Sequence, residues 1–385
     1  MQKIQFRKHL DELAKFWSEL LDKEYGGFYG YVSNEGVVDK KAVKGGILNS
    51  RILWFFSNAY LVKKDKNLLK CAKQAYDFLV NNALDKEYNG VYWSFNYDGS
   101  VEDDTKHTYN QAFAIYAHSS YYESSSDGEA LELAKKLYYL IEDKCKSETG
   151  YLECYQRDYS GLVSNEKLSE NGVIAERTMN TLLHVMEAYT QLYAVAPSDD
   201  VRESLIFILD LVENKIYNPK LKRQEVFFDA KLNSLIDLYS YGHDIETAWL
   251  VDRTLEVIEY KSESIAEITK TLAKQVYDIA YDGTSLANEC CEDKVDEARI
   301  WWVQAEAMVG FYNEYQKDNS KVEYLEATKS IWRFINKYLV RDNEKVEWYN
   351  CVTKEGVKIE GYSLVSMWKC PYHNGRMCIE MISRL

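Results

Sequence analysis

The chain has 385 residues, of which 46% are hydrophobic, enough to build a large core. Its formal net charge is −14 and no run of basic residues stands out, which argues against partners such as nucleic acid or anionic membranes. No apolar run approaches the roughly 20 residues of a membrane span, and the charged, amphipathic N-terminus is not typical of a secretory signal.

Two kinds of helical pattern alternate along the chain. Amphipathic stripes predict helices that cover a core, at residues 5–22, 67–83, 128–143, 200–215, 262–279 and 322–340. More uniformly apolar segments predict buried helices that begin near residues 48, 108, 176, 243, 301 and 371. Short aromatic stretches broken by glycine predict hairpins or extended loops, as at Glu24–Val32, Tyr88–Gly99 and Thr149–Gly161.

The buried helices recur with a loose period of roughly 65 residues. Six units, each with an apolar helix, an amphipathic helix and an aromatic loop, favour an all-α fold, the (α/α)6 barrel. Apolar helices would form the inner ring, with short β-hairpins and aromatic loops at the active-site mouth. An open solenoid of helix pairs is the alternative.

The composition of the chain also indicates how many domains it forms and in which cellular compartment it lies. The chain has only three prolines and no Gly/Ser-rich linker, so residues 1–385 are expected to form a single catalytic domain. A closed ring buries its own apolar faces, which favours a monomer. The eight cysteines form no CxxC pair, so we expect reduced thiols in a cytoplasmic protein.

Polar side chains cluster in the first turns of the predicted inner helices. If these helices run parallel, their first turns meet at one mouth of the barrel. Four of the six histidines belong to this set, and titratable groups gathered in one place mark a functional site. The set consists of Asn49, Arg51, His107, Tyr109, Asn110, Asn180, His184, His243, Glu246, Trp301, Trp302, Glu306, Tyr372, His373 and Arg376.

One of these helices, which Gly242 is expected to open as a hinge, carries His243, Glu246 and Trp249 at a spacing of three residues. This spacing puts the three side chains on one helical face. A purely structural interpretation is a core histidine that Glu246 satisfies. A metal site is another, since His184 or His373 could complete a ligand set with this face.

Several chemistries compete for this mouth. No HExxH motif is present, and tryptophans with an arginine suit a sugar better than a cation, so we expect no metal. No GxSxG elbow supports a serine nucleophile. Glu246 and Glu306 could serve as the two carboxylates of a glycosidase. Two imidazoles that titrate near neutrality favour proton transfer at carbon, one on each face of the substrate.

Six blocks of sequence resemble the cellobiose 2-epimerases, a branch of the N-acylglucosamine 2-epimerase superfamily of (α/α)6 barrels. The blocks run in the same order over nearly the whole chain, after a GGFYGYV loop. They are RILWFFSNAY, KHTYNQAFAIYA, RTMNTLLHVMEAYT, SYGHDIETAWLV, WWVQAEAMVGF and WKCPYHNGRM.

The resemblance implies an enzyme that interconverts the reducing-end glucose of a β-1,4-linked disaccharide (cellobiose, lactose or mannobiose) with mannose. A cis-enediol(ate) would form at C2, with no metal or other cofactor. In family terms His243 and His373 match the acid/base pair, and Glu246 matches the carboxylate that orients or tunes the first of them. His184 and Arg51 match groups that polarise O1 or O2.

The remaining matches concern binding of the sugar. Trp302 and Trp368 match a stacking platform. Residues that match positions binding or framing the reducing sugar are Tyr109, Asn180, Trp249, Trp301 and Glu306. An aldose–ketose isomerase or an N-acylglucosamine 2-epimerase of the same fold is the alternative, followed by a glycoside hydrolase and a non-catalytic sugar-binding barrel.

Overall fold

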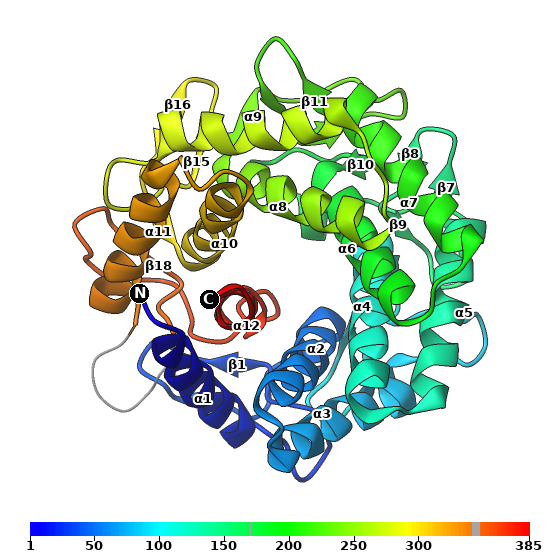
Figure 1. Ribbon diagram of the computed structural model, residues 1–385. Coiled ribbons are helices and arrows are strands. Elements are labelled where there is room, and N and C mark those ends of the chain that lie inside the picture. The colour runs from blue at the N-terminus through cyan, green and yellow to red at the C-terminus, as the bar shows by residue number, and fades with distance from the viewer. Residues whose placement is uncertain (170, 341–346) are drawn as a thin grey trace.

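The computed structural model describes residues 1–169, 171–340 and 347–385. Twelve α-helices in these residues alternate between an outer and an inner ring (Figure 1). The inner helices are α2 (Gly46–Lys63), α4 (Thr108–Ser125), α6 (Met179–Val195), α8 (Tyr241–Val257), α10 (Trp301–Lys317) and α12 (Tyr372–Arg384). The outer helices are α1 (Lys3–Glu19), α3 (Lys66–Phe78), α5 (Gly128–Lys144), α7 (Asp199–Leu211), α9 (Glu263–Ala280) and α11 (Val322–Phe334).

The inner helices close a ring. Each inner helix packs against the next inner helix, and the last of them, α12, contacts both α10 and α2 (Figure 1). This closure confirms the predicted (α/α)6 barrel and is inconsistent with an open solenoid. None of the helices in the described ranges is long and apolar enough to cross a membrane.

Burial follows the two sequence patterns. The helix α4 is buried continuously over 108–121, whereas α9 buries only one stripe, including Ile265, Leu272 and Val276. The outer helices begin at side-chain caps: Asp65, Asp127, Ser198 and Ser262 each accept a backbone N–H bond at the start of α3, α5, α7 and α9. Local chemistry therefore sets where these outer helices begin, and apolar burial sets which way they face.

Short strands and tight helical turns fill the connections. The antiparallel sheets are β1 (Tyr31–Val32) with β2 (Val38–Asp39); β3 (Lys44–Gly45), β4 (Ser94–Phe95) and β5 (Val101–Asp103); β6 (Lys106–His107) with β9 (Cys154–Tyr155); β7 (Lys146–Ser147) with β8 (Gly150–Tyr151); β10 (Arg177–Thr178) with β13 (Phe227–Phe228); β11 (Tyr217–Asn218) with β12 (Arg223–Gln224); β14 (Leu238–Ser240), β15 (Glu289–Cys291) and β16 (Lys294–Asp296); and β17 (Arg299–Ile300) with β18 (Cys351–Val352). Turns of π-helix follow α3, α7 and α11 at Leu79–Ala83, Val212–Ile216 and Ile335–Leu339, and a 3-10 turn covers Glu166–Leu168.

Five inner helices start directly from a strand: α2 from β3, α4 from β6, α6 from β10, α8 from β14 and α10 from β17. Strand pairing thus pins the first turns of these helices at one end of the barrel. It also corrects one predicted boundary, because α6 begins at Met179 and not near residue 176. Arg177 and Thr178 pair with Phe228 and Phe227 instead of continuing the helix.

A buried ion pair recurs at these helix starts. A basic residue just before an inner helix reaches back to an acid in the loop after the preceding outer helix. The pairs are Lys44 with Asp22, Lys106 with Asp85, Arg299 with Asp282 and Lys369 with Glu347. The three lysines are completely buried, so each depends on its carboxylate partner.

Candidate active site

A pocket of about 390 Å³ opens where the inner helices begin. Ten of the twelve residues to which the family resemblance assigns a role line it: Arg51, Tyr109, Asn180, His184, His243, Glu246, Trp301, Trp302, Trp368 and His373. The pocket is also lined by residues that the sequence did not single out: Lys167, Leu168, Ser169, Asn350 and Ser366. These five come from connecting segments, where no helical periodicity points to them.

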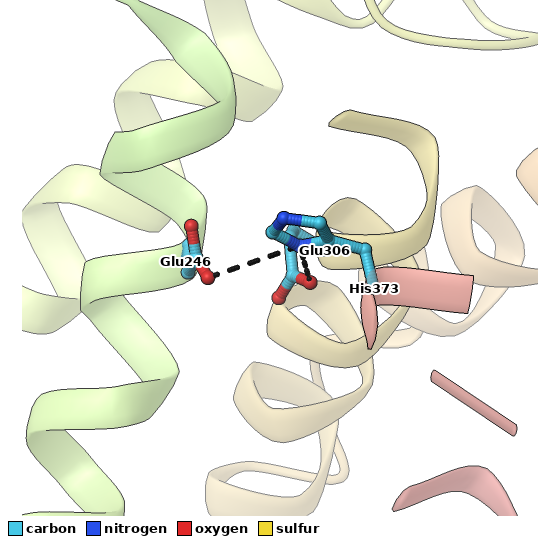
Figure 2. A group of neighbouring side chains, drawn as sticks. All are labelled: Glu246, Glu306 and His373. Carbon is cyan, nitrogen blue, oxygen red and sulfur yellow. Dashed lines mark hydrogen bonds and ion pairs between the residues drawn. The ribbon is translucent and has the colours of Figure 1, made fainter. Parts of the chain in front are cut away.

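Two predicted residues, Trp249 and Glu306, lie behind the pocket. The indole N–H of Trp249 donates to Glu306 Oε2 at 3.1 Å, and Glu306 Oε1 lies 2.8 Å from His373 Nδ1 (Figure 2). When this carboxylate accepts the Nδ1 proton of His373, Nε2 is the unprotonated ring nitrogen. Trp249 and Glu306 therefore do not line the pocket. They orient His373, which does.

The expected pair between His243 and Glu246 does not form. His243 Nδ1 bonds instead to Ser240 Oγ, at 2.7 Å, at the end of β14. Glu246 accepts a hydrogen bond from Arg376 and lies 4.0 Å from His373 Nδ1 (Figure 2). A shared helical face brings the two α8 side chains close, but the guanidinium from α12 is the stronger partner for the carboxylate.

Arg376 organises the floor of the site. Its guanidinium, completely buried, binds Glu187 and Glu246 and lies 2.8 Å from Glu306 Oε1. Glu187 in turn lies 2.9 Å from His184 Nδ1 and accepts the hydroxyl of Tyr372. One buried cation thus holds carboxylates from three inner helices, and these support two of the pocket histidines.

The same network shifts the pKa values of its carboxylates in opposite directions. Burial, reinforced by the charge of Glu306, raises the pKa of Glu246 to about 7. Burial alone would also raise the pKa of Glu187, but Arg376 and His184 outweigh it and lower that pKa to about 2. Glu246, Glu306 and His373 have the spacing of a metal site, yet Arg376 already takes oxygens of both carboxylates.

His243 and His373 enter the pocket as neutral bases. Burial lowers the pKa of His243 to about 3, and burial together with Arg376 and Arg51 holds the pKa of His373 well below its usual value. Both rings pack on the indole of Trp302, with centroid separations of 4.7 and 5.5 Å. The two imidazoles therefore flank one aromatic surface at the floor of a single pocket.

Arg51 has no acidic partner among the described residues. Its guanidinium lies over the rings of Phe113 and Tyr372, at 4.2 and 4.8 Å, and Nη2 donates to Tyr109 Oη at 2.7 Å. Because arginine is seldom buried without a carboxylate, this placement leaves a positive charge available to an anion or a polarised oxygen in the pocket.

Several other polar atoms in the lining lack a partner. Asn180 Oδ1, Trp301 Nε1 and Glu246 Oε2 are buried and make no hydrogen bond within the protein. Such atoms are costly unless a ligand satisfies them. Together with the aromatic faces of Trp302 and Trp368, they suit a ligand that carries many hydroxyl groups.

His107 does not reach the pocket, so the expectation that four histidines meet at the mouth is wrong in this instance. It is the last residue of β6, and its ring packs on Trp93 with centroids 4.1 Å apart. Its Nε2 lies 3.0 Å from Cys154 Sγ on the paired strand β9. The side chain is completely buried against these two residues, so its contacts are structural.

Replacing His243 by Asn is expected to reduce the acid sensitivity of folding. The unfolded imidazole titrates near 6.5 and the folded one at about 3, so the unfolded chain binds the proton more tightly. Stability is therefore lost as pH falls below about 6.5 toward 3, and Asn removes this loss, about 3 kcal/mol by pH 4.5. Urea unfolding at pH 7.5 and 4.5 measures it; an equal acid loss in both proteins would contradict it.

Comparison with known proteins agrees with this geometry. Residues 27–373 match the N-acylglucosamine 2-epimerase (GlcNAc 2-epimerase) family. A cellobiose 2-epimerase of Ruminococcus albus is 47% identical over 376 residues, which cover 97% of this chain and 96% of the relative.

Two solved structures share the whole fold. A sugar epimerase from a ruminal bacterium is 46% identical with a TM-score of 0.97, and the alignment covers 100% of this chain and 99% of that one. Cellobiose 2-epimerase from Bacillus thermoamylovorans is 42% identical with a TM-score of 0.96 and the same coverage. These findings confirm the resemblance seen in the sequence. The chain belongs to the N-acylglucosamine 2-epimerase family and is a carbohydrate epimerase.

Proposed function

We propose that the enzyme interconverts glucose and mannose at the reducing end of β-1,4-linked disaccharides such as cellobiose, lactose and mannobiose. The observation that carries this proposal is the pair of neutral imidazoles, His243 and His373, on one indole in a pocket with an unpaired arginine. Relatives at 47% and 46% identity that bear the name cellobiose 2-epimerase support the choice of substrate.

The chemistry begins with the open-chain sugar, because an aldehyde at C1 acidifies the hydrogen on C2. One imidazole, His243 or His373, takes that proton, and the electron pair of the C–H bond forms a cis-enediolate. The intermediate turns about its C2–C3 bond, and the other imidazole returns a proton to the opposite face of C2. Both imidazoles are neutral in the empty site, so the second binds a proton from solvent before it donates, and the first releases to solvent the proton that it took from C2. The negative charge of the enediolate raises the proton affinity of the second imidazole; where that imidazole is His373, this offsets the lowering of its pKa by burial, Arg376 and Arg51.

Other residues hold the sugar and its charge. Arg51 donates to O1 or O2, and His184, whose Nδ1 faces Glu187, donates from Nε2 when its ring carries a second proton, so that charge on the enediolate is offset as it forms. Trp302 and Trp368 stack on the sugar rings, while Tyr109, Asn180 and Trp301 bind hydroxyls. Glu246, Glu306 and Trp249 hold the floor around His373.

The enzyme acts without a cofactor, as a single-domain monomer. A positioned base is sufficient for a hydrogen beside a carbonyl, so the reaction requires no metal or other cofactor. Residues 1–385 act as a single catalytic domain, as a monomer and in the cytoplasm. Sedimentation velocity tests the monomer directly.

Incubation of cellobiose with the enzyme in heavy water, followed by NMR of the products, tests the substrate and the reaction together. The expected product is glucosyl-mannose with deuterium at C2. A ketose product would indicate an aldose–ketose isomerase, and free glucose a hydrolase. Unlabelled cellobiose recovered intact would contradict the disaccharide assignment. Parallel reactions with N-acetylglucosamine and free mannose distinguish a different sugar from an inactive protein.

Gly242→Ala is expected to lower kcat/KM by about 10- to 100-fold. A methyl group on Gly242 would lie 2.5 Å from two ring carbons of Trp302, so the indole under both histidines must shift. The matched control is Gly128→Ala, since a methyl group there meets no atom within 4 Å. Steady-state kinetics of both variants measure the effect, and equal rates would show that the position of Trp302 does not matter.

A further inference from the structure

The buried ion pair that recurs at the inner helix starts is changed in the unit that contains α6. This unit keeps the basic residue, Arg177, two positions before the helix, as Lys44 stands before α2 and Lys106 before α4. The acid is missing: Arg177 Nη2 donates instead to the hydroxyl of Ser147, at 3.1 Å. A neutral oxygen therefore replaces the carboxylate that neutralises the cation in the units with Lys44 and Lys106.

Arg177 is 93% buried, given its relative exposure of 7%, and the carboxylates of Glu176, Asp229 and Glu153 act on it without forming an ion pair. Its Nε and Nη1 make no hydrogen bond, and no carboxylate forms an ion pair with it in the described ranges. Glu153 lies nearby but is already engaged by the backbone N–H of Thr178 and the hydroxyl of Thr181, both at 2.6 Å. An unpaired buried guanidinium of this kind is costly unless an anion accompanies it.

Arg177 lines a small cavity. The cavity measures about 10 Å³, close to the space that one water-sized sphere requires. Its polar lining comes from Arg177, Thr178 and Thr149, and its remaining walls are mainly apolar, among them Leu182, Leu211 and Phe228. The volume excludes phosphate, sulfate or a carboxylate-bearing metabolite, while the charge and the donors favour a single-atom anion.

We propose that this cavity is a binding site for a monatomic halide, chloride in the cell, which takes the place of the missing carboxylate. The halide accepts from the guanidinium of Arg177 and neutralises it. It lies beneath the start of α6, the helix that carries Asn180 and His184, so it stabilises that part of the barrel and takes no part in proton transfer.

Thermal unfolding of the whole enzyme in chloride and in gluconate, at constant ionic strength, tests the site. From about 5 to 300 mM chloride, Tm is expected to rise by about 2–3 °C relative to gluconate. Ser147→Asp supplies an internal carboxylate and should abolish the chloride dependence while raising Tm in gluconate. Exposed Arg333 provides the control, because Arg333→Met should leave the chloride dependence unchanged.

Crystals soaked in bromide provide an independent test that does not depend on stability. An anomalous peak beside Arg177 in the unmodified enzyme, absent from Ser147→Asp, would establish the site. Equal Tm in chloride and gluconate, together with no bromide peak at Arg177, would overturn the proposal. A chloride effect that persists undiminished in Ser147→Asp would overturn it as well.

Discussion

Replacing either His243 or His373 by Asn is expected to reduce interconversion of the two epimers by at least about 10²-fold, the usual scale of a lost acid or base. Each imidazole is needed in both directions of the reaction, once to accept a proton and once to give one. NMR of the equilibrating disaccharide gives the rate for each variant.

The matched control for this loss is His118→Asn. His118 is also a buried histidine of an inner helix, but its Nδ1 lies 2.7 Å from the carbonyl oxygen of Ala114 and it does not line the pocket. Its replacement should leave the rate within a few-fold of normal wherever the protein stays folded. Near-normal turnover in His243→Asn or His373→Asn would contradict the assignment of the acid/base pair.

Arg376→Met is expected to destabilise the fold by about 3–5 kcal/mol, the cost of removing one partner from a buried charge network. Its loss would leave Glu187, Glu246 and Glu306 close together without their shared cation. The destabilisation caused by Arg376→Met should become smaller as pH falls toward 5. In the variant the folded carboxylates bind protons more tightly than the unfolded ones, so acid favours the folded state.

Arg384→Met on the same helix is the control for Arg376. Arg384 pairs with Glu380 near the far end of α12, where it is partly exposed, so its removal should cost no more than about 1 kcal/mol. Chemical denaturation at pH 5 and 7.5 compares the two. Equal losses, or a loss in Arg376→Met that does not depend on pH, would show that the carboxylates do not need this guanidinium.

The fold was predictable because one physical pattern repeats. Helices buried all round and helices with a single apolar face alternate along the chain, and a double ring satisfies both. The same pattern also allows an open solenoid, which the packing of α12 against α2 excludes. The boundary of α6 was missed although Thr178 caps the helix, its hydroxyl accepting the backbone N–H of Thr181, because the strand pairing of Arg177 and Thr178 has no local signal. Their strand partners, Phe227 and Phe228, lie some 50 residues later in the chain.

Most of the site was predictable for a related reason, since parallel inner helices bring their first turns together. The hydrogen-bond partner of Glu246 was not predictable. The i,i+3 spacing brings Glu246 near His243, but it cannot show that Arg376 from another helix binds the Glu246 carboxylate instead. Ser240 and Glu187 were missed as supports of His243 and His184, although Glu187 follows His184 at the same spacing of three. Asn350 and Ser366 reach the pocket through connections that carry no periodic signal.

Hydrogen exchange at C2, measured separately from each epimer in heavy water, tests the two-histidine account most directly. If His243 and His373 serve opposite faces, each Asn variant should still exchange the C2 hydrogen of one epimer without converting it. The epimer that exchanges should differ between the two variants. Exchange lost equally from both epimers in both variants, or retained from the same epimer in each, would contradict two bases on opposite faces.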